Sequence, residues 1–174
     1  HMGNLFYGMG LAPKILNFGK KQFNNGITLH FIKMIQIDGI VKKSLQKNRT
    51  EIELEILVNK IFDVIIILKN NNMNHGDFHI GNIGYMIKDD GEMEIKWIDY
   101  GMSSHIECVE LDILRFIRIT HLIIKNPNRD TLDRIIRKKS SELLGLTYPT
   151  YNGTNNIDKE FKSLETFLRN NLSI

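Results

Sequence analysis

The sequence predicts an α+β fold that is mainly helical, with a small embedded β-hairpin and a second hairpin near the N-terminus. Apolar residues recur at helical spacing after residue 51, two short strand-like runs flank an Asp-Asp-Gly turn, and helical patterns return after residue 109. The chain has 174 residues, of which 42% are hydrophobic and 25% charged. These values are ordinary for a globular domain and exclude collagen-like and disordered classes.

The N-terminal part is predicted to be irregular chain followed by a hairpin. Residues 3–10 are rich in glycine, so we expect no regular element there. Two apolar runs at 13–18 and 28–37 are separated by residues 20–26, which contain Asn-Asn-Gly. This pattern predicts a β-hairpin. A short polar helix is expected over 38–47.

The central helix carries the clearest start signal. Thr50 is followed three residues later by Glu53, the spacing of a capping box, and the sequence predicts a helix over 51–69. The second half of this segment is apolar nearly all round, which indicates a buried helix.

The remaining elements follow from turn signals and hydrophobic spacing. Strands are expected over 83–88 and 93–98, joined by an Asp-Gly turn that suits positive φ. Further helices are expected over 109–124, 130–144 and 158–170. The basic stretch at 134–139 is either a solvated helix face or a contact for an anionic partner.

Composition also limits the function classes. The single cysteine, Cys108, excludes an internal disulfide and predicts an intracellular, cytoplasmic protein. No apolar run is long enough for a membrane span. The net charge of +3 is too small to predict a nucleic-acid partner. Abundant Ile, Asn and Lys suggest an AT-rich genome such as that of a large DNA virus, in which case host cytoplasm or the virion is the expected location.

The run HGDFHIGN at 75–82 concentrates the groups that could carry chemistry. Asp77 and Asn82 lie five residues apart in a loop, and Asp99 follows the second strand of the hairpin that begins just after Asn82. Because a hairpin returns the chain beside its start, Asn82 and Asp99 should lie close together. Their oxygens are hard ligands suited to Mg²⁺, while Asp77 could accept a hydroxyl proton. Phosphoryl transfer requires these groups.

This pattern resembles the catalytic region of the protein-kinase-like superfamily. Residues 75–82 match its H-x-D-x-x-x-x-N loop, and the DYG at 99–101 matches its metal-binding D-F-G. The loop sequence, with His79 at its fifth position, is similar to that of aminoglycoside and choline kinases and of atypical and viral kinases. The resemblance implies that Asp77 is the catalytic base and that Asn82 and Asp99 are catalytic groups that bind Mg²⁺.

Supporting residues are implied by the same resemblance. His75 would brace the loop structurally, together with His79, and Gly101 would complete the metal-binding turn. Asp112 resembles the helix aspartate that supports the backbone of the catalytic loop.

The resemblance extends to a hinge that would hold the nucleotide. The segment FIKMIQIDG at 31–39 resembles the fifth strand and hinge of the kinase small lobe. The backbone of Ile35 and Ile37 would bind the adenine of ATP, and Met34 would line the back of the pocket. Residues 1–37 are then a remnant of the small lobe with the hinge, and residues 38–174 the large lobe. The expected reaction moves the ATP γ-phosphate to a hydroxyl acceptor, either a protein or a small molecule.

Three parts of the kinase pattern have no counterpart in the sequence. The Gly-rich phosphate loop, the ATP-binding lysine and its glutamate partner on a helix are missing, so we expect a truncated small lobe. A partner chain or a swapped dimer could complete the site. The alternative is an inert kinase-like protein (a pseudokinase) that binds or scaffolds.

Other interpretations of the loop remain open at this point. His75, Asp77 and His79 could form a transition-metal site of a hydrolase. Asp77 and Asn82 could serve only as caps in a polar loop, and Asp99 could be a simple turn residue. Asp112 could equally be a solvent-facing charge.

Overall fold

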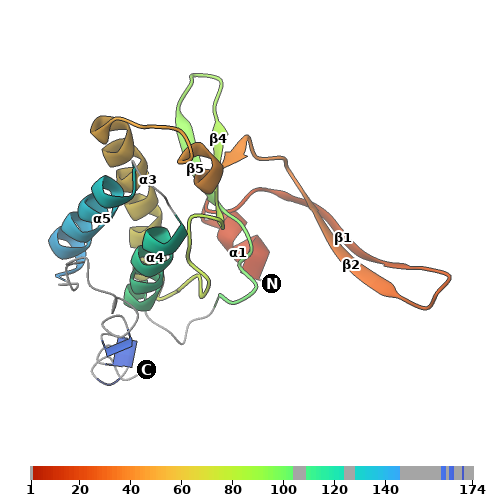
Figure 1. The fold of residues 1–174 in the computed structure, drawn as a ribbon. Coiled ribbons are helices and arrows are strands. Elements are labelled where there is room, and N and C mark those ends of the chain that lie inside the picture. The colour runs from red at the N-terminus through yellow and green to blue at the C-terminus, as the bar shows by residue number, and fades with distance from the viewer. Residues whose placement is uncertain are drawn as a thin grey trace.

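The computed structural model describes residues 2–103, 109–123 and 128–145, together with residues 162, 163, 165, 166 and 170. A helical body with a small sheet carries one long hairpin that projects away from it (Figure 1). The elements are α1 (Met2–Gly8), β1 (Ile15–Gln22), β2 (Thr28–Met34), β3 (Gly39–Ile40), α2 (Val41–Ser44), α3 (Glu51–Asn70), β4 (Ile83–Ile87), β5 (Met93–Trp97), α4 (Val109–Ile123) and α5 (Asn128–Leu144).

Helix α3 is the centre of the body, as the sequence predicts. The Thr50 side chain accepts a hydrogen bond from the Glu53 amide, and the Glu53 carboxylate accepts one from the Thr50 amide, so the predicted capping box is confirmed. Val58, Ile61 and Ile65 on this helix are almost completely buried. Helices α4 and α5 and strand β5 pack against it.

The embedded hairpin is confirmed, and a short strand joins its outer edge. Strands β4 and β5 pair antiparallel with Ile83 opposite Trp97, and β3 pairs with β4. The sequence predicts a helix over 38–47, but its first part forms β3 and only Val41–Ser44 is helical. Gly39 permits this pairing because any side chain there would collide with the Tyr85 ring.

The prediction of irregular chain at residues 3–10 is wrong. These residues belong largely to α1, and the Phe6 side chain is completely buried in the core of the body. Phe6 and Met9, three residues apart, lie on one face of the helix and pack into the core, which outweighs the helix-weakening effect of glycine. The chain after α1 is fixed to β5, where the Trp97 amide donates to the Leu11 carbonyl and the Lys96 ammonium to the Gly10 carbonyl.

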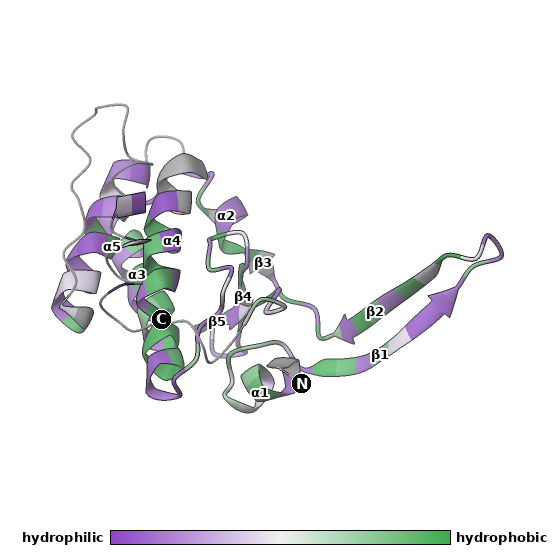
Figure 2. Ribbon diagram, turned by 90° about the horizontal axis from the view of Figure 1, so that it is seen from below, coloured by the Kyte–Doolittle hydropathy of each residue, from purple (hydrophilic) through white to green (hydrophobic). Residues whose placement is uncertain are grey.

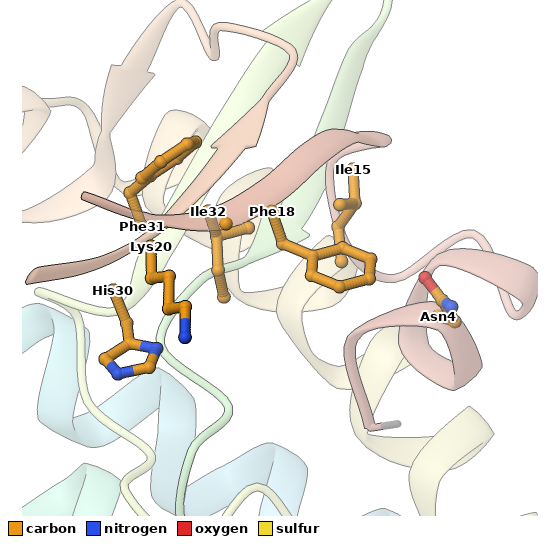
Figure 3. A pocket seen from close by; sticks show the side chains of 8 residues that line it. Asn4, Ile15, Phe18, Lys20, His30, Phe31 and Ile32 are labelled. Carbon is orange, nitrogen blue, oxygen red and sulfur yellow. The ribbon is translucent and has the colours of Figure 1, made fainter. Parts of the chain in front are cut away.

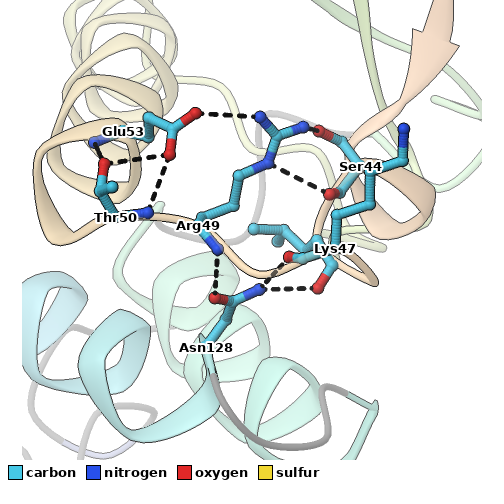
Figure 4. A network of polar contacts seen from close by, with 7 residues as sticks. Ser44, Lys47, Arg49, Thr50, Glu53 and Asn128 are labelled. Carbon is cyan, nitrogen blue, oxygen red and sulfur yellow. Dashed lines mark hydrogen bonds and ion pairs between the residues drawn. The ribbon is translucent and has the colours of Figure 1, made fainter.

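A buried asparagine joins the start of α5 to the chain between α2 and α3 (Figure 4). Asn128 accepts a hydrogen bond from the Arg49 amide at 3.1 Å and donates to the carbonyls of Leu45 and Lys47 at 2.9 and 2.7 Å. Arg49 itself reaches Ser44 and Glu53. The network satisfies backbone groups that the short helix α2 leaves unpaired.

The basic stretch on α5 is not a uniformly solvated face. Arg137 pairs with Asp133 at 2.7 Å with both side chains mostly buried, whereas Arg134 pairs with Glu51 at the surface. The predicted helix over 158–170 falls largely outside the described residues, as does Cys108. Among the helices that the structure describes, none has the length and apolar character needed to cross a membrane.

The hairpin β1–β2, predicted from residues 13–37, forms a two-stranded antiparallel sheet of its own. Almost all of its side chains are exposed. In Figure 2 it extends from the body with hydrophobic and hydrophilic stretches on both strands.

Candidate active site

The loop at 75–82 is built around a buried histidine. The His75 Nε2 lies 3.2 Å from the Ile98 carbonyl oxygen, and its Nδ1 lies 3.4 Å from the Asp77 amide nitrogen. Since the carbonyl can only accept and the amide can only donate, this arrangement requires the neutral Nε2–H tautomer. Burial of the ring lowers the pKa of His75 to about 4, which keeps it neutral in the physiological range.

Asp112, on the first turn of α4, holds the backbone of the same loop. Its carboxylate accepts hydrogen bonds from the amides of His75 and Gly76, and it is 1% exposed. Arg115, one turn along the helix, donates to the Gly76 carbonyl at 3.0 Å. The structure thus places Asp112 in the core against the loop backbone rather than on the solvent-facing surface.

Gly76 lets the loop lie directly against the chain after β5. It has a φ of +81°, and a Cβ atom there would overlap the Met102 carbonyl oxygen. The neighbouring Ser103 hydroxyl donates to the His75 carbonyl at 3.0 Å. Residues 75–77 and 99–103 are therefore held together as one unit.

Asp77 and Asn82 meet within the loop. The Asn82 amide group donates to both the carbonyl oxygen and the Oδ2 of Asp77, at 3.0 and 2.9 Å. The Asp77 side chain is 45% exposed, so its carboxylate is fixed on one side and open to solvent on the other. His79 Nε2 lies 3.6 Å from Asp77 Oδ2, while its Nδ1 accepts a hydrogen bond from the Gly81 amide.

Asp99 is brought beside Asn82 by the embedded hairpin. The Ile98 amide donates to the Asn82 carbonyl at 3.0 Å, so the residue before Asp99 contacts Asn82 directly. Asp99 has a φ of +57°, which is uncommon for a residue other than glycine. Such strain often occurs at functional sites. Gly101, in the turn that follows, is exposed.

A line of aromatic rings supports the loop from inside the body. Phe6 stacks on Tyr100 with ring centroids 5.4 Å apart, and His75 packs edge-on to Phe6 and against Trp97. Burial raises the pKa of the Tyr100 hydroxyl. The Tyr100 hydroxyl has no hydrogen-bond partner among the described residues.

Sequence reasoning missed Phe6, Ser103 and Arg115. The position of Arg115 three residues after Asp112 could have indicated a shared helix face. The contacts of Phe6 and Ser103 depend on how distant segments pack, for which the sequence offers no local signal.

The predicted hinge residues lie at the base of the β1–β2 hairpin. Met34 ends β2, and the Ile35 amide donates to the Lys14 carbonyl at 2.9 Å, so that amide is already used within the protein. Of the Ile35 backbone, the carbonyl is the group left for a ligand. Ile37 packs over Gly84, close enough that a side chain at Gly84 would collide with it.

A metal site composed of His, Cys, Asp and Glu is not formed in the described part of the chain, where no group of three such residues is positioned to hold an ion. The cluster of His75, Asp77 and His79 is thus not assembled, because the His75 ring is directed to Ile98. Asn82 and Asp99, unlike His75, have side-chain oxygens available to a metal ion. The Asn82 amide oxygen and the Asp99 carboxylate accept no hydrogen bond from the described residues, so both retain lone pairs.

This chain is similar to a protein kinase. It is 26% identical over 101 residues to a protein of Dictyostelium discoideum named as a probable serine/threonine-protein kinase. The match covers 54% of this chain and 15% of that relative, so the chain spans only a small part of the relative's length. A scan against protein-family models found no match.

Proposed function

We propose that this chain contains the large lobe and part of the small lobe of a kinase-like phosphotransferase. The observation that carries the proposal is the hydrogen-bonded pair of Asp77 and Asn82 on a loop whose backbone Asp112 holds, with Asp99 next to Ile98, whose amide donates to the Asn82 carbonyl. The partial likeness to a named kinase supports it. A half-exposed carboxylate beside an amide and a second carboxylate is the donor set that phosphoryl transfer uses.

Asp77 would act on the acceptor. Its exposed carboxylate takes the proton of an acceptor hydroxyl as that oxygen bonds to the γ-phosphorus of ATP, and the bond to the bridging oxygen breaks to release ADP. The hydrogen bond from Asn82 fixes the orientation of the carboxylate. His79 Nε2 lies 3.6 Å from the same oxygen, and the Gly81 amide donates to its Nδ1, so the ring is held beside the carboxylate.

Asn82 and Asp99 would hold Mg²⁺. The ion usually takes one or two protein oxygens and completes its shell with water and phosphate, and the lone pairs on these two side chains fit that requirement. When bound, it would neutralise phosphate charge. ATP itself would place its base against Met34 and the backbone of Ile35 and Ile37.

The test is ATP turnover by the full chain with γ-labelled ATP, following both self-labelling and release of phosphate. Asp77→Asn should lower either signal by at least about a hundredfold, since general-base contributions have that size. Asp89→Asn, an exposed residue in the β4–β5 turn, is the matched control and should leave the signal unchanged. Turnover that survives Asp77→Asn would refute the assignment.

The second candidate is an inert kinase-like binding protein. It is favoured by the Ile35 amide, which donates to the Lys14 carbonyl at 2.9 Å and is therefore not available to bind adenine. Calorimetric titration with Mg²⁺ and ATP separates the two candidates. Binding that disappears in Asn82→Ala and Asp99→Ala supports the enzyme, whereas no binding in any variant supports the inert protein.

A further inference from the structure

The β1–β2 hairpin, here called the arm (residues 15–34), has open edges and two exposed faces. Each of its strands pairs only with the other within the described part of the chain, so one edge of each strand lacks a partner. An isolated two-stranded ribbon is marginally stable in water. Open edges of this kind readily accept another strand.

Large apolar side chains lie on both faces of the arm. Residues directly opposite in the register share a face, which places Phe18 beside Ile32 on one side and Phe31 over Gly19 on the other. Phe18 is 76% exposed. Exposed apolar residues that form a contiguous patch, rather than scattered single ones, mark an interaction surface.

The arm is hollowed where it meets α1, and the lining includes Gly19 and Phe31 from the second face as well as residues of the first. A cavity of about 540 Å³ lies there, with Ile15, Phe18 and Ile32 toward its base and Lys20 and His30 toward the tip of the arm (Figure 3). Lys20 and His30 are opposite each other across the strands, so the two basic groups stand side by side. Asn4 of α1 borders the cavity from the body.

The arm is basic without any compensating acid. Residues 1–37 contain Lys14, Lys20, Lys21 and Lys33 and no Asp or Glu, whereas the whole chain has a net charge of only +3. The overall charge therefore conceals a basic arm on a body close to neutral. A binding surface that is apolar and basic selects a ligand that is apolar and acidic.

We propose that the arm binds an extended polypeptide segment of another protein, one that alternates apolar and acidic side chains and adds as a third strand. Backbone pairing with an open edge would provide affinity. Its apolar side chains would cover Phe18 and Ile32, and its carboxylates would face Lys20 and His30. This inference does not rest on phosphotransfer activity.

The same observations disfavour other occupants. A second arm would bring three lysines against three lysines with no acid between them. A nucleic acid would satisfy the lysines and could stack its bases on the exposed rings of the arm, but it would leave the aliphatic side chains Leu16, Ile27, Leu29 and Ile32 without a matching partner. A small ligand in the cavity would leave the open edges of both strands uncovered.

The test is selection from a library of random peptides displayed against the immobilised 174-residue chain. We expect the enriched peptides to alternate aliphatic or aromatic residues with Asp or Glu. A synthetic peptide from the selection should bind at least about tenfold more weakly to Phe18→Ser or Ile32→Ser. Ile52→Ser, at an exposed site on α3, is the matched control and should bind as the parent does.

Charge reversal and amide exchange make the test specific. The triple variant Lys20→Glu, Lys21→Glu, Lys33→Glu should select peptides that carry Lys or Arg instead. Bound peptide should protect alternate amides along β1 or β2 from hydrogen exchange. The fluorescence of Trp97, which is buried in the body, verifies that each variant remains folded.

Several results would overturn the proposal. These are no enrichment above background, enriched peptides without acidic residues, or binding that leaves the amides of both strands unprotected. Concentration-dependent dimerisation in sedimentation that Phe18→Ser abolishes would identify a second copy as the occupant. Tight binding of oligodeoxythymidine with no peptide selected would identify a nucleic acid instead.

Discussion

Asp112 holds the backbone of His75 although 37 residues separate them in the chain. The carboxylate is buried at the start of α4 and accepts both the His75 and the Gly76 amides. The position of the candidate site therefore depends on a residue that does not itself face solvent. Because Asp112 is part of the core and also holds the loop, a change that destabilises the body also changes the geometry of the loop.

Removing the Asp112 carboxylate should destabilise the whole body. Asp112→Ala leaves two amides unpaired in the core, and we expect a loss of about 2–4 kcal/mol in the free energy of unfolding. Asp112→Asn retains one acceptor oxygen and should lose less. Urea unfolding followed by Trp97 fluorescence measures both variants. Equal stability of Asp112→Ala and the parent would contradict the hydrogen bonds.

The stability of the protein should fall as pH drops below the ordinary pKa of histidine. The unfolded chain binds a proton at His75 near pH 6.5, whereas the folded protein binds it only near 4. The unfolded state therefore takes up more protons in this window, and stability decreases as pH falls through it. The contribution of His75 is about 2 kcal/mol between about pH 7 and about pH 5.

His75→Gln isolates this contribution from the other titrating groups. Gln can still donate to the Ile98 carbonyl but does not titrate. Urea unfolding of parent and variant at the two pH values should show a smaller pH effect in the variant. Parallel pH dependence in both proteins would assign the effect to other residues.

Tyr100 carries a buried hydroxyl with no hydrogen-bond partner among the described residues. A buried polar group left unpaired costs about 1–3 kcal/mol. Tyr100→Phe keeps the stacking on Phe6 and removes the hydroxyl, so it should leave stability unchanged or raise it by about that amount. Thermal unfolding measures the change. A clear loss of stability would show that the hydroxyl is satisfied after all, for example by water.

Asn128 should be intolerant of both an apolar and an isosteric replacement. Asn128→Ala removes three hydrogen bonds to the chain around Arg49, for a loss of about 2–3 kcal/mol. Asn128→Asp keeps the acceptor for Arg49 but turns a carboxylate oxygen toward two carbonyls, so it should be at least as damaging. Chemical unfolding ranks the variants, and a stable Asn128→Asp would show that the donated bonds are dispensable.

The elements that sequence predicted well are those with local signals. The capping box at Thr50 and Glu53 fixed the start of α3, and Asp-Gly at 90–91 fixed the turn of the embedded hairpin. The proximity of Asn82 and Asp99 followed from hairpin geometry alone. Their roles in catalysis stay predictions.

The features that could not be predicted from the sequence depend on contacts between segments far apart in the chain. The segment around Phe6 is helical despite three nearby glycines, and the Phe6 ring packs against Tyr100 in the core. The exposure of the arm was also not visible, since apolar runs at 13–18 and 28–37 look the same in a buried hairpin and an open one. Charge summed over the chain hid the basic arm, because acidic residues elsewhere cancel it.

The candidate site has a consequence for how this protein folds. The loop at 75–82, Asp99 and Asp112 lie between positions 75 and 112, and the contact from Asp112 to His75 closes 37 residues. Short loops close at low entropic cost, and structures rich in local contacts form quickly. The site should therefore assemble in the same kinetic phase as the β4–β5 hairpin and α4, without waiting for the arm to order.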